Sequence, residues 1–112
     1  MENLEHKGFC VSTVIMNNKL SKDEAALYEA IGMLETPEEI KRFMADLCTP
    51  GEIKAFTERW AIAKLLDKGE DGYREIAAET KASTTTVARV ARFLKQENYQ
   101  GYRLILDRLK SK

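Results

Sequence analysis

Apolar residues recur every three or four positions through most of the chain after residue 20, which is the spacing of helices that bury one face. Three of these segments begin with a hydroxyl residue three positions before a glutamate, at Ser21, Thr36 and Thr49. A hydroxyl at this position can cap a helix while the glutamate bonds back to the capping residue. Pro37 and Pro50 also suit the first position of a helix. We therefore expect helices to begin near residues 22, 37 and 50.

The apolar faces of these three helices are wide for a short chain. The first stripe contains Leu27, Ile31 and Leu34, the second Ile40, Phe43, Met44 and Leu47, and the third Ile53, Phe56, Trp60 and Ala63, widened by Ile62, Leu65 and Leu66. Gly69 follows the third stripe and suits a left-handed helix end. Faces this wide imply a deep core or a partner, and we expect a tight homodimer.

The pattern after Gly72 predicts three further helices. A short helix should run from Tyr73 to Thr80, a second from about Thr84 to Gln96, and a last one from Tyr99 to Leu109. No alternation of period two is present beyond the first 19 residues. The predicted fold class is all-α, with six helices.

The segment Tyr73–Gln96 has the pattern of a helix-turn-helix. Small and β-branched residues stand where two steeply crossing helices would meet, at Ile76, Ala77, Ala82, Val87 and Val90. In the turn, Lys81 stands where many such motifs have glycine, and a left-handed lysine costs on the order of 1 kcal/mol.

Side chains on the other face of the second helix suit contact with DNA. They are Thr84, Thr85, Ala88, Arg89, Arg92 and Lys95. Short side chains at the front of a helix can approach base edges and thymine methyls, while arginines farther along can reach phosphates or guanine. The alternative interpretation is a solvated basic hairpin with no nucleic-acid partner.

Charge is distributed unevenly although the net charge is zero. Residues 20–53 contain three basic and eight acidic side chains, whereas residues 73–112 contain nine basic and four acidic ones. The second half can therefore meet phosphates. Neutral net charge by itself favours the alternative of an interaction module.

Cysteine and histidine content excludes several classes of function. Cys10 and Cys48 form no CxxC pair and His6 is the only histidine, so neither a zinc cluster nor a disulfide framework can be built. A single histidine near a terminus also argues against an enzyme. We expect no metal and no cofactor, and a reducing, cytoplasmic location.

The N-terminal segment differs in character from the rest. Its apolar run, Phe9–Met16, is too short to span a membrane, so no membrane anchor is expected. Residues 1–19 are interpreted as an extension, either disordered or foreign to the native chain, before a helical domain of residues 20–112. The β-branched residues between 11 and 15 could also form an edge strand.

Taken together, these residues resemble the Trp repressor, and most closely the Trp-repressor-like family of YerC/YecD type. The runs that carry the resemblance are Leu47–Glu52 (LCTPGE) and Lys81–Arg89 (KASTTTVAR), with Arg59, Lys68–Glu70 and Arg74 in the same register. The resemblance covers residues 20–110 in helix number and order. It implies interlocked subunits of a twofold dimer that hold two reading helices about one DNA turn apart.

The resemblance also implies roles for individual residues. Positions that approach bases in the repressor match Arg74, Thr84, Thr85 and Ala88. Positions near phosphates match Arg59, Thr86, Arg89 and Lys95, to which we add Arg92 from the helix pattern. Ala77 stands where the repressor has a lysine, so the preferred operator should differ.

The effector site implied by the resemblance is altered in this chain. In the repressor the indole of tryptophan lies between two arginines that match Arg59 and Arg89, beside threonines that match Thr49 and Thr86. A glycine and a serine of that slot are replaced here by Val90 and Phe93, whose bulk should fill it and extend the core. We therefore expect a vestigial pocket and no activation by tryptophan, with any other small-molecule effector unidentified.

Two functions remain open from the sequence. The first is a sequence-specific, DNA-binding transcriptional regulator that acts on double-stranded DNA as a homodimer. The second is a helical dimeric protein-interaction module without specific DNA binding.

Overall fold

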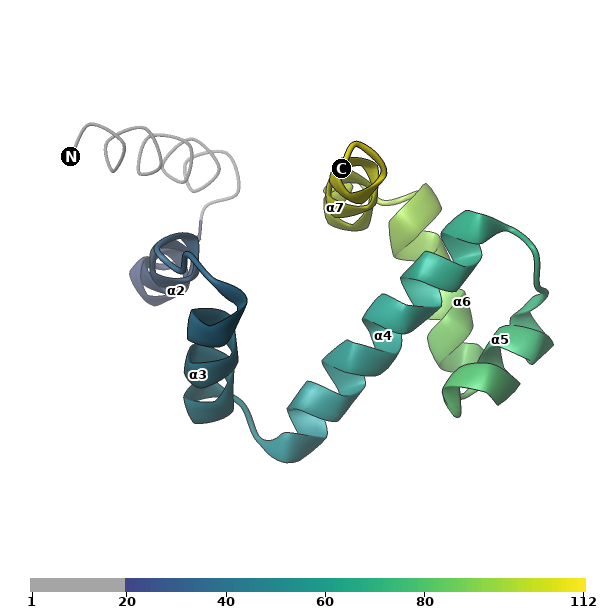
Figure 1. The fold of residues 1–112 in the computed structure, drawn as a ribbon, viewed down its shortest axis with the longest axis horizontal. Helices are drawn as coiled ribbons and strands as arrows, with labels where there is room; N and C mark the ends of the chain where they lie inside the picture. Colours follow the sequence, from purple (N-terminus) through teal and green to yellow (C-terminus); the bar gives the residue numbers. More distant parts are fainter. Residues whose placement is uncertain (1–19) are drawn as a thin grey trace. The chain divides into compact units, whose positions relative to one another are not determined.

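The structure is a computed structural model that describes residues 20–112, and its regular elements in that range are helices (Figure 1). They are α2 (Lys22–Gly32), α3 (Pro37–Leu47), α4 (Pro50–Lys68), α5 (Tyr73–Thr80), α6 (Thr84–Lys95) and α7 (Gly101–Lys110). The all-α fold with six helices in the predicted order is confirmed. The expected N-terminal extension and its edge strand lie outside the described residues.

The predicted capping residues begin the first three of these helices. The backbone N–H of the glutamate three residues on donates to the hydroxyl of Ser21 at 3.0 Å, of Thr36 at 3.1 Å and of Thr49 at 3.1 Å. Glu52 completes a capping box by accepting the backbone N–H of Thr49 at 2.8 Å. At the other end of α4, Gly69 has the expected left-handed conformation with φ 76°. Local hydrogen bonding therefore sets these boundaries.

Two compact units make up the chain, one ending at Leu47 and one beginning at Cys48. In the first unit, neither α2 nor α3 contains a fully buried residue. The apolar stripes of these helices are therefore only partly covered.

The core of the second unit forms around α4, which contacts α5, α6 and α7. Its buried residues are Ile62, Ala63, Leu66, Ile76, Ala77, Val87, Val90, Ala91, Leu94 and Leu106. Trp60 and Tyr102 stack at the edge of this core with ring centroids 6.4 Å apart. This core fixes how α5 and α6 are presented.

An ion-pair cluster fastens α7 to α4. The Asp67 carboxylate, whose side chain is 13% exposed, lies 2.9 Å from the Arg103 guanidinium and 3.0 Å from Lys110 Nζ. Hydrogen bonds from Lys110 and then Arg103 hold the pKa of Asp67 below its ordinary value. Arg103 also reaches Asp107 at 3.3 Å within α7.

The turn between α5 and α6 contains a non-glycine residue in the left-handed region. Lys81 has φ 62° and ψ 24°. Lysine is unfavourable in this left-handed conformation, because its Cβ crowds the backbone.

The Asp67→Asn variant should be less stable than the wild type at neutral pH and equally stable in acid. Because the pKa of Asp67 is lowered in the fold, the ion pairs contribute above the ordinary pKa of 3.8 and their contribution disappears as the pH falls through the lowered value. Thermal unfolding between about pH 2.5 and pH 7 measures the difference. Asp107→Asn, a more exposed partner of Arg103, is the matched control and should change stability little. A wild-type advantage that persists unchanged in acid would contradict this account.

Lys81→Gly should raise the free energy of unfolding by up to about 1 kcal/mol, because glycine adopts the left-handed conformation without strain. Ala78→Gly, at an exposed position inside α5, is the control and should lower stability by about 0.5–1 kcal/mol. Denaturant unfolding of both variants measures the two effects. Equal destabilisation by both substitutions would show that the Lys81 backbone is not strained.

Candidate nucleic-acid interface

Hydrogen bonds at the end of α5 and at the start of α6 define the turn that joins them. Near the end of α5, the Thr80 hydroxyl donates to the carbonyl of Ile76 at 2.8 Å. Ser83 caps α6 by accepting the backbone N–H of Thr86 at 3.1 Å. Ala82, between Lys81 and Ser83, packs against the core. The turn therefore joins two short helices that share one core.

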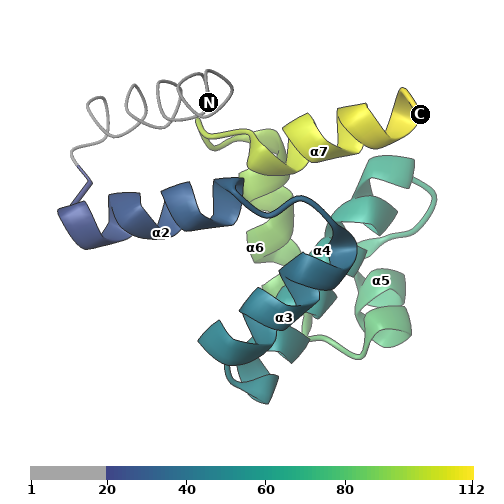
Figure 2. The same ribbon diagram turned by 60° about the vertical axis from the view of Figure 1, so that its left-hand side comes forward.

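Helix α6 has one buried and one exposed face. Val87, Val90, Ala91 and Leu94 are buried against the rest of the second unit. Figures 1 and 2 show α7 at the C-terminal end of α6, so the N-terminal end of α6 and the turn are not covered by α7. Six side chains on the outer face are exposed, namely Thr84, Thr85, Ala88, Arg89, Arg92 and Lys95.

The four residues expected to contact bases are all exposed. Arg74 lies in the first turn of α5, and Thr84, Thr85 and Ala88 lie in the first half of α6. The hydroxyl of Thr84 and the methyl of Ala88 suit base edges and thymine methyls. The two helices that carry these residues are joined by the Lys81 turn and pack on one core.

The residues expected to contact phosphates are in more varied surroundings. Arg89 and Arg92 extend along α6, and Lys95 ends it. Arg59 is half-buried on α4, with its guanidinium 5.8 Å from the ring centroid of Phe56. Thr86 is half-buried, and its hydroxyl lies 3.0 Å from the hydroxyl of Ser83.

Phe93 lies beneath the two arginines of α6. The guanidinium carbon of Arg89 is 4.4 Å, and that of Arg92 5.0 Å, from the centroid of the Phe93 ring. Arg92 Nε also lies 3.2 Å from a carboxylate oxygen of Glu97. This cluster was not predicted from the sequence, although the spacing of four between Arg89 and Phe93 places both on one side of a helix.

A hollow of about 300 Å³ opens beside Phe93, between the end of α6 and the start of α7. Its lining consists of Arg89, Phe93, Glu97, Tyr99, Gln100, Gly101 and Tyr102. Gln100 at its edge is left-handed with φ 55°, and its side-chain amide donates to the carbonyl of Glu97 at 2.6 Å.

Comparison with known protein families identifies the family of this chain. The sequence profile of the family described as Trp repressor protein matches residues 22–110. The chain belongs to the Trp repressor family. The uncharacterized protein YerC of Bacillus subtilis is 40% identical over 89 residues, which cover 80% of this chain and 84% of YerC.

Two crystal structures resemble the chain in fold as well. A TrpR-like protein from Eubacterium eligens is 37% identical with a TM-score of 0.74, over 83% of this chain and 95% of that one. A protein from Staphylococcus aureus, proposed to be a Trp repressor, is 36% identical with a TM-score of 0.75, over 87% and 95%. The expected membership of a Trp-repressor-like, YerC-type family is confirmed.

The residues that match the repressor's effector slot have other contacts here. The Thr49 hydroxyl caps α4, the Thr86 hydroxyl lies 3.0 Å from that of Ser83, and Val90 is 1% exposed within the core. Phe93 was expected to extend the core with Val90, but it is only half-buried and carries the guanidinium of Arg89. Arg59 lies over Phe56, so each arginine of the pair has a ring of its own helix beside it.

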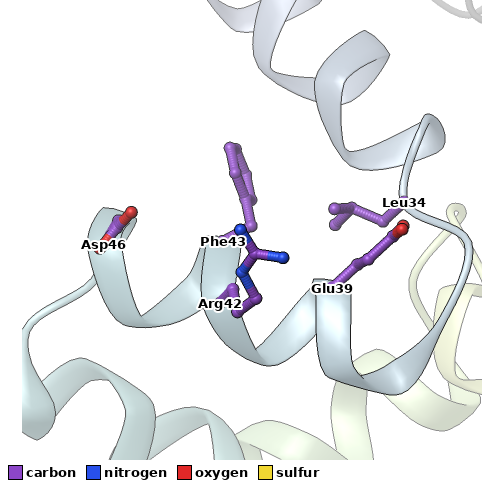
Figure 3. A pocket seen from close by; sticks show the side chains of 5 residues that line it. All are labelled: Leu34, Glu39, Arg42, Phe43 and Asp46. Carbon is purple, nitrogen blue, oxygen red and sulfur yellow. The ribbon is translucent and has the colours of Figure 1, made fainter.

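The first unit has a hollow of its own, of about 340 Å³ (Figure 3). Leu34, Glu39, Arg42, Phe43 and Asp46 line it. One oxygen of Glu39 accepts the backbone N–H of Glu35 at 2.8 Å, so this carboxylate helps to set the start of α3. The apolar side chains of Leu34 and Phe43 in this lining belong to the incompletely covered stripes of α2 and α3.

Metal and membrane sites are not part of the described structure. Among residues 20–112, no group of three histidine, cysteine or acidic side chains is placed to hold a metal ion. Within the same range, no helix has the length and apolar character needed to cross a bilayer.

Proposed function

We propose that the chain is a sequence-specific, DNA-binding transcriptional regulator that acts as a homodimer. The observation that carries this proposal is the exposed face of α6, where Thr84, Thr85 and Ala88 stand in front of a row of cationic side chains. The opposite face is fixed to α4 and α5 by the core. A rigidly held helix with short side chains at its front suits insertion into the major groove.

Electrostatics support the same proposal. The first turn of α6 contains no acidic residue, so the positive end of its dipole is not neutralised from within the helix. Farther along, Arg92 and Lys95 add charge in the last turn. A DNA phosphate near the start of α6 would be attracted by the helix dipole, and one near its end would be attracted by Arg92 and Lys95. The acidic surplus of residues 20–53 belongs to the first unit, apart from Glu52.

Incompletely covered apolar faces support the dimer. Large apolar side chains that are 42–58% exposed include Ile31, Met33, Ile40, Leu47, Leu104, Ile105 and Leu109. A second copy of the chain can bury such faces, and family membership favours a twofold arrangement. The regulator would act in the cytoplasm and would have no catalytic role.

Selection of bound sequences from a random double-stranded DNA pool tests this function directly. The expected result is a palindromic consensus with half-sites about 34–36 Å apart, as two reading helices on a twofold axis require. If no sequence is enriched while the chain is dimeric, the alternative function as a protein-interaction module is favoured.

Variants at the DNA interface should separate base contacts from phosphate contacts. Arg74→Ala should weaken binding to the selected sequence by roughly 1–3 kcal/mol and reduce discrimination, and Thr84→Val should act in the same direction. Arg92→Ala should weaken binding to all sequences nearly equally and reduce the salt slope by about one for each subunit of the dimer. Affinity measured on selected and scrambled duplexes gives both quantities. If all three variants keep the wild-type specificity profile, the assignment of base contacts is wrong.

Free tryptophan should not activate DNA binding. Val90 is buried, the Thr49 hydroxyl caps α4 and the Thr86 hydroxyl is paired with that of Ser83. The positions that match the effector slot therefore offer little room and few free polar groups. Calorimetry with tryptophan at about millimolar concentration, together with DNA binding with and without it, measures this. Saturable binding that raises DNA affinity more than about tenfold would contradict it.

A further inference from the structure

The ring of Phe93 connects the two arginines of the reading helix. Both guanidinium carbons lie within 5.0 Å of its centroid, and one of these arginines, Arg92, is also paired with Glu97 at 3.2 Å. The arrangement is therefore a carboxylate, a guanidinium, an aromatic ring and a second guanidinium in contact in that order. From the sequence, Phe93 was expected only to fill the effector slot with its bulk.

The ring is better fixed than the arginines that it contacts. Phe93 is half-buried and lines the same hollow as Tyr102. Tyr102 in turn stacks on Trp60 of α4. By contrast, the side chain of Arg92 is 57% exposed. An exposed arginine that no neighbour holds samples many rotamers. When it binds a phosphate it loses this conformational entropy, which lowers the affinity.

We infer that Phe93 is a positioning residue that presets Arg89 and Arg92 for DNA phosphates, with Glu97 as a second anchor for Arg92. This inference rests on the proposed function, because it assigns the two arginines to phosphates. Contact between a guanidinium and an aromatic face at an exposed site is worth about two- to fivefold in an equilibrium constant. The ring itself touches no DNA and works through the two cations.

The first test uses the DNA-free protein and side-chain NMR of the arginine Nε–Hε groups. A proton above the face of an aromatic ring is shifted upfield, so the Arg89 and Arg92 signals of the wild type should lie upfield of those in Phe93→Leu. Phe93→Tyr keeps the ring and should keep the shifts. Identical shifts in the wild type and Phe93→Leu would overturn the inference before any DNA is added.

The second test is a double-mutant cycle on the affinity for the selected duplex. Phe93→Leu should weaken binding about tenfold for each subunit, the effect of losing two such contacts, and so about a hundredfold for the dimer, while the salt slope stays unchanged because both cations remain. In an Arg89→Ala, Arg92→Ala background the same substitution should cause no further loss. Phe93→Tyr should bind as the wild type does.

The control is Tyr99→Leu, which removes a 75% exposed ring from the lining of the same hollow and should leave affinity unchanged. Unfolding and oligomeric state of each variant are measured alongside. If Phe93→Leu weakens binding equally with and without the two arginines, the ring acts through packing and the inference is wrong. If the wild type binds no DNA, the proposed function itself fails, which is a different outcome.

Discussion

The proposed DNA-binding surface depends on the burial of one face of α6 against α4 and α5. Val87, Val90, Ala91 and Leu94 are at most 4% exposed, and they fix the rotation of α6 about its axis. With a repeat of 3.6 residues per turn, this rotation alone decides that Thr84, Thr85 and Ala88 face outward. A packed core tolerates few alternative arrangements, so the same residues that stabilise the unit also aim its reading face.

Two further interactions refine that arrangement. The left-handed backbone at Lys81 and the cap at Ser83 set where α6 begins, and the Asp67 cluster fastens α7 to the C-terminal end of α4. Phe93 and Glu97 then order the long cationic side chains of α6. Core packing thus places the helix, while polar and cation–π contacts place its side chains.

The sequence predicted the helices well because their boundaries depend on local chemistry. A hydroxyl cap, a glutamate three residues on and a closing Gly69 are readable without knowledge of the tertiary structure. Outward positions on α6 were also predictable, since helical periodicity separates them from the valines. The start of α7 was less predictable: the expected start at Tyr99 lies two residues before the observed Gly101, because Gln100 adopts a left-handed conformation that apolar spacing does not encode.

Contacts between elements could not be predicted in the same way. The pairing of Asp67 with Arg103 and Lys110 joins residues far apart in sequence, and many other carboxylates were equally plausible partners. The expectation that Phe93 is buried in the core was wrong for a related reason. Its size suggested that it would join the core, whereas the ring is half-buried and contacts the Arg89 guanidinium, a contact that size alone does not encode.

The central claim is that the outer face of α6 meets the phosphates and bases of DNA. It is tested most directly by the affinity of the full-length wild-type chain for its selected duplex, measured over a range of salt concentrations. The account predicts that the logarithm of the affinity falls linearly with the logarithm of the salt concentration, with a slope between about −4 and −9 for a dimer with several phosphate contacts on each subunit. Absent or salt-independent binding by a correctly folded dimer would contradict it.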